Sequence, residues 1–299
     1  MTEDNVLGRI AGIYRYPVKS MAGEALDEAT ITSAGLLGDR AYALIDVETG
    51  NVVSAKSVKR FPGVLSCQAS FSVSPTMEDP HPAVRIDLPD GTSVTSEDED
   101  CDAVLSAYFG RQVRLASSAP KDFTIDHYYP DVSGADPAGN SDTTLAQPLG
   151  AALFESMGVA SPVPAESFFD VFPLSVITSA TLEQLTQEKP DSNFDQARFR
   201  MNVLVKSQAS GFVENAWVGQ ALQLGEQAGV AVTMADPRCV MTTLAQPGLE
   251  QDIEVLKTLV RCNRIQVGEA GMYPVAGVYA AVTRSGDIKL DDTIERVLV

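Results

Sequence analysis

A chain of 299 residues, 44% of them hydrophobic and 21% charged, is long enough for two domains that each have their own core. Its formal net charge of -18, from 40 acidic against 22 basic residues, argues against nucleic acid or an anionic membrane surface as the main partner. No run of about 18 apolar residues occurs, so the sequence predicts no membrane span.

The cysteines and histidines exclude several kinds of metal site. The four cysteines lie far apart, without the paired spacing of zinc ribbons or iron–sulfur clusters. Only His81 and His127 are present, which disfavours a histidine-based metal site or a serine–histidine triad. The acidic start of the chain leads into no apolar signal segment. We therefore expect a protein of the reducing cytoplasm.

The first 117 residues predict a mostly β domain with at least one helix. Strands are predicted over residues 9–16, 29–32, 41–47 and 65–71. Cys67 occupies a core-facing position of the last of these strands. Ser96 and the three acids after it form a capping-box pattern, which predicts a helix start there, and Gly110 suits the C-cap.

Residues 118–164 differ in composition from what precedes and follows them. Pro, Gly, Ser and Asp dominate, and only a short helix around 149–157 is predicted. A loop of this length inside a compact protein is usually functional or mobile. We interpret the segment as the connection between two domains, and it could fold over a site.

The second predicted domain covers residues 165–299 and is mainly β. Strands are predicted over 168–178, 203–205, 217–224, 230–234, 275–282 and 288–299, and helices after Ser179 and over 253–260. The whole chain is therefore predicted to be α+β and predominantly β, with helices at the periphery of the second domain.

A lone cysteine follows the predicted strand over 230–234. Pro237 ends the regular pairing of that strand, because proline has no N–H to donate. Arg238 stands directly before Cys239, and a neighbouring cation favours the thiolate, which attacks electrophiles and binds metals. The alternative is that Cys239 is a small buried apolar residue.

Several polar residues stand at predicted strand ends and turns. They are Lys19, Ser20, Arg40, Thr178, Ser179, Arg200, Asn202 and Arg238. If the strands bring the four cations together, they form a pocket for a multiply charged anion with a thiolate at its edge. A helix that starts at Ser179 would add free N–H groups. The alternatives are surface ion pairs with the many acids and plain helix capping.

Seven short motifs, in order along the chain, resemble those of the MOSC family. They are Tyr16-Pro17-Val18-Lys19-Ser20, Gly35-Leu36-Leu37-Gly38-Asp39-Arg40, Val176-Ile177-Thr178-Ser179-Ala180-Thr181-Leu182, Arg198-Phe199-Arg200-Met201-Asn202, Trp217-Val218-Gly219, Pro237-Arg238-Cys239 with Thr242-Thr243, and Gly277-Val278-Tyr279. The chain is particularly similar to the type that includes the mitochondrial amidoxime-reducing component and its bacterial relatives. This resemblance implies an N-terminal mixed β-barrel-like domain followed by a MOSC-type β-barrel domain.

The resemblance also implies a cofactor and a site. The cofactor would be molybdenum held by molybdopterin, with Cys239 as the thiolate ligand of the metal. The polar residues named above would hold the pterin and its phosphate, and Asp236 is the candidate proton donor by its position. A soft thiolate suits a metal already bound by sulfur, and forked arginines suit phosphate.

The implied activity is the reduction of N-oxygenated compounds, such as N-hydroxylated bases, amidoximes or hydroxylamines. Because the chain lacks cluster-spaced cysteines, a separate electron-donor protein of iron–sulfur, flavin or haem type is expected. The alternative from the same resemblance is a cofactor carrier, or a sulfur carrier with a persulfide on Cys239. A third is a relative whose pocket binds some other phosphate.

Three positions depart from the family pattern. Asp236 stands where relatives often carry a second cysteine, and Met201 where they often have proline. Asp291-Asp292-Thr293 replaces a common Gly-Asp-Pro. These departures bear on substrate and activity more than on cofactor binding.

Overall fold

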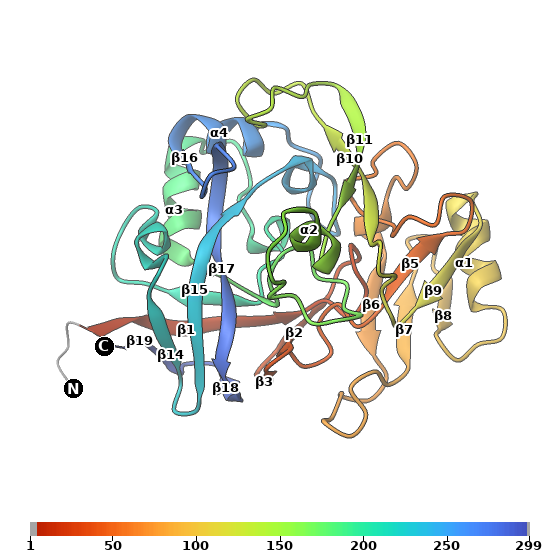
Figure 1. Ribbon diagram of the computed structural model, residues 1–299, viewed down its shortest axis with the longest axis horizontal. Helices are drawn as coiled ribbons and strands as arrows, with labels where there is room; N and C mark the ends of the chain where they lie inside the picture. The colour runs from red at the N-terminus through yellow and green to blue at the C-terminus, as the bar shows by residue number, and fades with distance from the viewer. Residues whose placement is uncertain (1–4, 298–299) are drawn as a thin grey trace.

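The computed structural model describes residues 5–297 and is mostly β, with 35% strand and 17% helix (Figure 1). The predicted fold class is thereby confirmed. The strands are β1 Val6–Arg15, β2 Glu24–Leu26, β3 Glu28–Thr32, β4 Gly35–Leu36, β5 Ala43–Asp46, β6 Gln68–Phe71, β7 Val84–Asp87, β8 Ser93–Thr95, β9 Val113–Ala116, β10 Thr124–Tyr129, β11 Thr143–Pro148, β12 Leu174–Thr178, β13 Val203–Lys206, β14 Ala221–Leu224, β15 Ala228–Pro237, β16 Arg264–Gln266, β17 Met272–Arg284, β18 Gly286–Lys289 and β19 Thr293–Arg296. The α-helices are α1 Cys101–Phe109, α2 Ala151–Ser156, α3 Ser179–Glu188 and α4 Glu254–Cys262.

Seven strands close into a barrel, which removes the open edges of a sheet. Their order is β12-β13-β1-β19-β14-β15-β17, and β17 pairs with β12 to complete the ring. β1, from the start of the chain, lies between β13 and β19, so it shares one sheet with strands from residues 174–296. Apolar side chains such as Ile10, Val203 and Val230 fill the core of this barrel.

A second β unit lies beside the barrel, at the right of Figure 1. It contains the pair β5–β9, the three-stranded sheet β6-β7-β8 and helix α1. Cys67 is fully buried in its core, as predicted. The predicted strand over 65–71 begins only at Gln68, because Gly63 adopts φ +79 and leads into a 3-10 helix over Val64–Ser66.

Helix α1 corrects one prediction and confirms another. It begins at Cys101 rather than at the capping-box pattern. Ser96 instead accepts a hydrogen bond from the Val84 N–H at 3.1 Å, and Asp98 accepts one from the Thr95 N–H at 2.7 Å. These polar side chains therefore close a turn ahead of the helix. The C-cap is Gly110 at φ +63, as predicted.

Residues 118–164 contain more regular structure than the sequence indicates. The predicted short helix is confirmed as α2, and β10 and β11 form an antiparallel hairpin that composition did not reveal. The hairpin is tied to the second β unit through hydrogen bonds from Val52 N to Thr124 O and from Tyr128 N to Lys56 O, both 2.9 Å. In Figure 1 the hairpin rises above the rest of the fold and α2 lies in front.

Helices α3 and α4 pack together beside the barrel. Leu185 of α3 and Leu259 of α4 share a buried cluster with Ile177 of β12. The cap of α3 is Thr178, whose side chain accepts from the Thr181 N–H, so the predicted cap at Ser179 is one residue late. Within residues 5–297, no helix has both the length and the apolar character needed to cross a membrane.

Gly277 gives a test of how tightly the barrel wall is packed. It lies in β17 at φ +78, and a Cβ there would be 2.3 Å from Met201 Cε and 2.7 Å from Val176 O. Gly50 has a similar φ of +73 but no atom within 4 Å. We expect Gly50→Ala to cost about 1 kcal/mol from backbone strain alone, and Gly277→Ala to cost about 1–3 kcal/mol more from the clash. Urea unfolding measures both losses, and equal losses would contradict the packing described.

Candidate functional site

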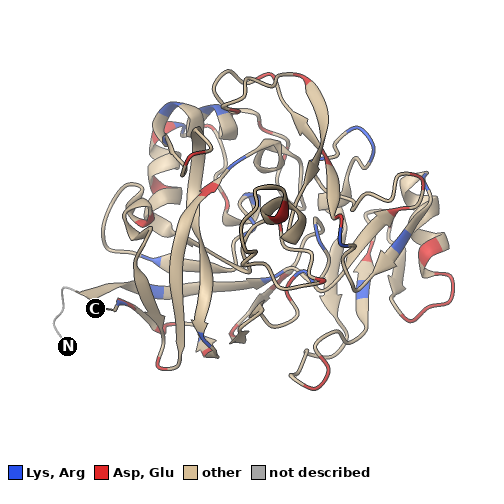
Figure 2. Cartoon of the chain, in the orientation of Figure 1, with Lys and Arg blue, Asp and Glu red and all other residues tan. Residues whose placement is uncertain are grey.

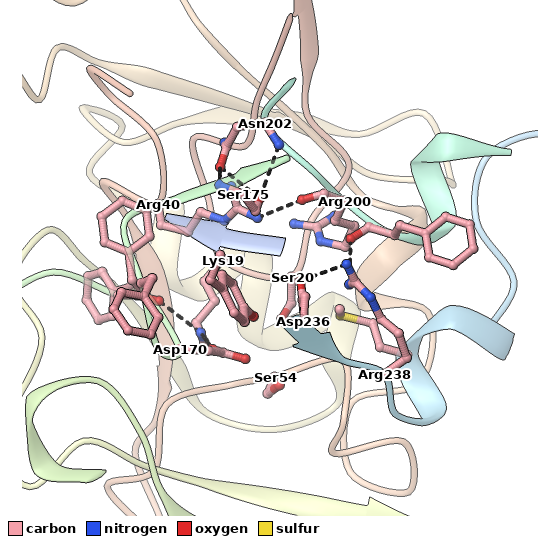
Figure 3. A pocket seen from close by; sticks show the side chains of 16 residues that line it. Lys19, Ser20, Arg40, Ser54, Asp170, Ser175, Arg200, Asn202, Asp236 and Arg238 are labelled. Carbon is pink, nitrogen blue, oxygen red and sulfur yellow. Dashed lines mark hydrogen bonds and ion pairs between the residues drawn. The ribbon is translucent and has the colours of Figure 1, made fainter. Parts of the chain in front are cut away.

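The structure brings seven of the predicted site residues into one pocket, here called the cationic pocket (Figure 3). They come from three turns and from the end of strand β15. The seven are Lys19, Ser20, Arg40, Arg200, Asn202, Asp236 and Arg238. The pocket has a volume of about 70 Å³, which suits a compact group with the size of a few water molecules.

Backbone strain is concentrated around this pocket. Among residues 5–297, six non-glycine residues have positive φ, and three of them line the pocket. These are Ser20 at +67°, Arg40 at +49° and Arg200 at +54°. Such conformations cost free energy and persist where the surroundings enforce them, often at ligand-binding sites.

Two guanidinium groups lie against one tyrosine ring. Arg40 is 4.5 Å and Arg200 4.2 Å from the centroid of Tyr16, within cation–π range. The Tyr16 N–H donates to Asp39 at 2.8 Å, and Asp39 forms an ion pair with Arg40. Asn202 Nδ2 donates at 2.8 Å to Asp39 Oδ2, the same oxygen that pairs with Arg40. The network therefore fixes Arg40 through Asp39, and Asn202 holds Asp39 in place.

Arg200 is the least satisfied cation of the pocket. Its Nη1 donates to Met21 O at 2.6 Å, but its Nη2 is buried and has no hydrogen-bond partner within residues 5–297. Burial, and then the nearby Arg40, lower the pKa of Arg200 to about 10. A buried donor without a partner is costly, so this guanidinium is prepared for an anionic acceptor.

A carboxylate that the sequence analysis missed joins two lysines at the side of the pocket. Asp170 pairs with Lys19 and, at 2.7 Å, with Lys56. Burial opposes ionisation of Asp170, but the two ammonium groups hold its pKa well below the usual range. Burial lowers the pKa of Lys19 to about 8 despite Asp170. The missed signal is a single acid within the apolar run Phe168–Phe172.

Arg238 is largely occupied by the protein itself. It donates to Ala276 O from Nε and Nη2, to Phe199 O from Nη1, and pairs with Asp236 at 2.6 Å. Burial raises the pKa of Asp236 to about 6, although Arg238 and a hydrogen bond with Tyr279 oppose this rise. Arg238 therefore positions the end of β15 and the carboxyl group of Asp236.

Cys239 is half-buried and borders a larger cavity of about 360 Å³. The cavity shares Asp170, Phe172, Arg238 and Tyr279 with the cationic pocket. The Thr242 hydroxyl donates to Cys239 O at 3.1 Å, which helps to fix the turn that carries the thiol. Cys239 thus lies at a cavity, unlike Cys67 and Cys101, which are buried in a core.

The residues that the structure describes contain no group of three His, Cys, Asp or Glu side chains able to hold a metal ion. A metal at Cys239 would therefore have to bring most of its other ligands with it. Lys56, also missed by the sequence analysis, lines the same cavity as Cys239. Burial lowers its pKa, but the interaction with Asp170 outweighs this and raises the pKa.

Thr178 and Ser179 line neither cavity. The Thr178 hydroxyl donates to Glu214 at 2.7 Å and accepts from the Thr181 N–H, so it serves the start of α3. Ser179 Oγ is buried, with no hydrogen-bond partner within residues 5–297. The anion-binding role predicted for this helix start therefore finds no support in the lining of the pocket.

The two cavities are unusually rich in cations for so acidic a chain. Lys19, Lys56, Arg40, Arg200 and Arg238 border them, against the nearby carboxylates of Asp39, Asp136, Asp170 and Asp236. Many acids lie instead on outer loops, such as the red loop before α1 in Figure 2. Local electrostatics therefore favour an anion here despite the net charge of -18.

Comparison with known proteins places two domain families on this chain. Residues 7–111 match the MOSC N-terminal beta barrel domain, and residues 165–295 match the MOSC domain. The chain is 24% identical over 306 residues to the human mitochondrial amidoxime reducing component 2, covering 98% of this chain and 84% of the relative. It is also 24% identical over 305 residues to the human mitochondrial amidoxime-reducing component 1, covering 96% and 82%. The solved structure of the YUAD protein from Bacillus subtilis is 10% identical, with a TM-score of 0.44 over 97% of this chain and 94% of that one.

Inorganic phosphate provides a direct test of the cationic pocket. Bound to cofactor-free protein at ten times its dissociation constant, it should stabilise the fold by about 1.4 kcal/mol and raise the midpoint of thermal unfolding. Arg200→Gln should remove most of this rise, because it removes the buried donor without a partner. Arg85→Gln is the control, because this half-exposed arginine lines neither cavity. An equal rise in all three proteins would contradict the assignment.

Proposed function

The chain belongs to the MOSC family, with an N-terminal MOSC β-barrel domain followed by a MOSC domain, and from this premise we propose that it is a molybdenum-cofactor oxidoreductase that reduces N-hydroxylated compounds. The observation that carries the proposal is the adjacency of two features. A pocket with a buried guanidinium donor that has no partner among the described residues adjoins a cavity bordered by one half-buried thiol.

The residues present fit the cofactor in two respects. Arg200 Nη2, buried without a partner within residues 5–297, suits an oxygen of the pterin phosphate. Cys239 offers a single soft ligand at a cavity, which suits a metal already held by the dithiolene sulfurs of the pterin. Lys19, Ser20 and Arg40 would hold the anionic end beside Arg200, whereas Asn202 and Arg238 would keep these groups in place.

When bound, the cofactor supplies the two-electron chemistry that breaks an N–O bond. For an amidoxime, the substrate takes up two electrons and two protons, and gives an amidine and water. Asp236 remains the candidate proton carrier, since it is a buried carboxyl group at the cationic pocket with a hydrogen bond to Tyr279. The chain's own contribution is to bind, to orient and to hold this proton.

The names of these relatives describe amidoxime reduction, and their similarity over nearly the whole chain supports the same reaction class here. The two electrons would come from a separate donor protein of iron–sulfur, flavin or haem type. We keep the cytoplasm as the proposed location, whereas the relatives are named mitochondrial.

Turnover tests the proposal. Protein from a host that makes the cofactor should reduce benzamidoxime with reduced methyl viologen as the electron source. Cys239→Ser should lower the rate at least about 100-fold, because it replaces the proposed metal ligand. Cys262→Ser, at the other half-buried thiol, should leave the rate nearly unchanged.

Two outcomes would contradict this function. One is a wild type that carries the cofactor but turns over no N-hydroxylated compound. The other is a gain of about 32 Da, one sulfur atom, on Cys239, which would favour the sulfur carrier with a persulfide. Equal rates for the wild type and Cys239→Ser would remove the thiol from the reaction.

A further inference from the structure

The cavity beside Cys239 has the size and lining of a site for a small organic molecule. Its volume of about 360 Å³ is more than twice the roughly 150 Å³ of a cavity that binds benzene. Leu149, Leu153, Phe154 and Phe172 give it an apolar wall. Lys56, Asp136, Asp170 and Arg238 add charged groups to the same lining. A metal held by Cys239 would occupy part of the volume, and the remainder suits a small ring compound.

Much of this wall comes from the segment between the two domain matches. All residues proposed to hold the cofactor lie within residues 7–111 or 165–295, which match the family. Outside those matches, the β10–β11 hairpin contributes His127, Tyr129 and Gln147 to the cavity. The segment after the hairpin, also outside the matches, contributes Leu149, Leu153 and Phe154.

The hairpin is a fixed wall. Besides the two backbone bonds that tie it to the second β unit, the Ser57 hydroxyl donates to Asp126 O at 2.8 Å. On the other side of the cavity, Pro137 lies so close to Gly271 that a Cβ at Gly271 would be 2.8 Å away. Groups on the hairpin are therefore held in defined positions toward the cavity.

His127 carries a polar atom that the described chain leaves without a partner. The side chain is 8% exposed and lines the cavity, and its ring stacks on Tyr129 with 4.2 Å between centroids. Its Nδ1 pairs with Gln147 Oε1, which can only accept, so Nδ1 carries the proton. Nε2 is then an acceptor, and it is buried with no hydrogen-bond partner within residues 5–297.

The imidazole stays neutral over the physiological range. Burial, and then the positive charge of Lys56, lower the pKa of His127 to about 4, although Gln147 opposes this. Since an unpaired buried acceptor is unfavourable, a ligand that supplies an N–H or O–H donor gains affinity over one that does not.

We propose that the cavity beside Cys239 is the substrate site and that His127 Nε2 accepts a hydrogen bond from a ring-bearing substrate, thereby selecting substrates with a donor group on the ring. This assignment rests on the proposed function for its reacting N–O group. The donor preference and the role of His127 follow from the hairpin itself and concern binding.

Calorimetry on the cofactor-loaded protein tests the preference. The probes are 3- and 4-aminobenzamidoxime and their methyl isosteres, which differ only in the donor. At least one amino probe should bind about tenfold more tightly than its methyl partner, the usual value of one net hydrogen bond. His127→Phe should reduce that ratio to about one, and His127→Gln, which retains an acceptor, should keep part of it. His81→Phe, at the other histidine of the sequence, should keep all of it.

A wild-type measurement keeps the test independent of variant folding. In ¹⁵N spectra the Nε2 signal of His127 should shift on adding the preferred amino probe and not its methyl isostere, while Nδ1 stays protonated. Equal affinities within each pair, or no binding of any probe, would overturn the proposal. Binding to cofactor-free protein alone would also overturn it, because the cavity would then belong to the cofactor.

Turnover separates this inference from the proposed function. Binding with the donor preference but without reduction of any probe would leave the site standing and remove the reductase. Reduction of all probes without the donor preference would support the reductase and remove the role proposed for His127.

Discussion

The candidate site depends on a cluster of buried positive charge that the fold neutralises only in part. Arg40 and Arg200 lie against the same Tyr16 ring, and like charges so close in a buried place repel unless an anion joins them. Asp39 pairs with Arg40, but Nη2 of Arg200 has no partner among the described residues. Both arginines have positive φ, a strained backbone conformation that the surrounding structure enforces. We interpret this stored cost as favouring an anion in the pocket, such as the phosphate of the proposed cofactor.

The closed barrel explains how residues far apart in sequence can hold so unfavourable a cluster. β1 delivers Lys19 and Ser20 from the start of the chain, and β13 and β15 adjoin Arg200 and Arg238. Because β1 pairs with β13 and β19 in the barrel, the turn after β1 lies beside residues from the second half of the sequence. The cationic pocket therefore stands on hydrogen-bonded strands, whereas the hairpin of residues 118–164 shapes the neighbouring cavity.

The sequence was informative where local pattern decides the outcome, and weak where distant contacts do. Alternation and turn residues predicted most strands, the buried Cys67 and the cap at Gly110. The resemblance grouped ten residues into one site, and seven of them line one pocket. The capping pattern at Ser96 misled because its side chains bond to a neighbouring strand and turn, which no local rule reveals.

The same limit applies to the site. Lys56 and Asp170 were missed because their role depends on an ion pair between residues 114 positions apart in the sequence. His127 was discounted as a metal ligand, and its cavity-facing acceptor depends on hairpin register with Gln147. Thr178 and Ser179 matched the motif, but their hydroxyl groups lie at the start of α3 and line neither cavity.

The central claim is that one thiol and one cationic pocket together hold a molybdenum cofactor. Elemental mass spectrometry, with pterin quantified on the same samples, tests it most directly on protein from a host that makes the cofactor. The account predicts near-stoichiometric molybdenum and pterin in the wild type and in Cys262→Ser, with the metal lost or labile in Cys239→Ala. A wild type without metal or pterin, beside a loaded control protein from the same host, would contradict it.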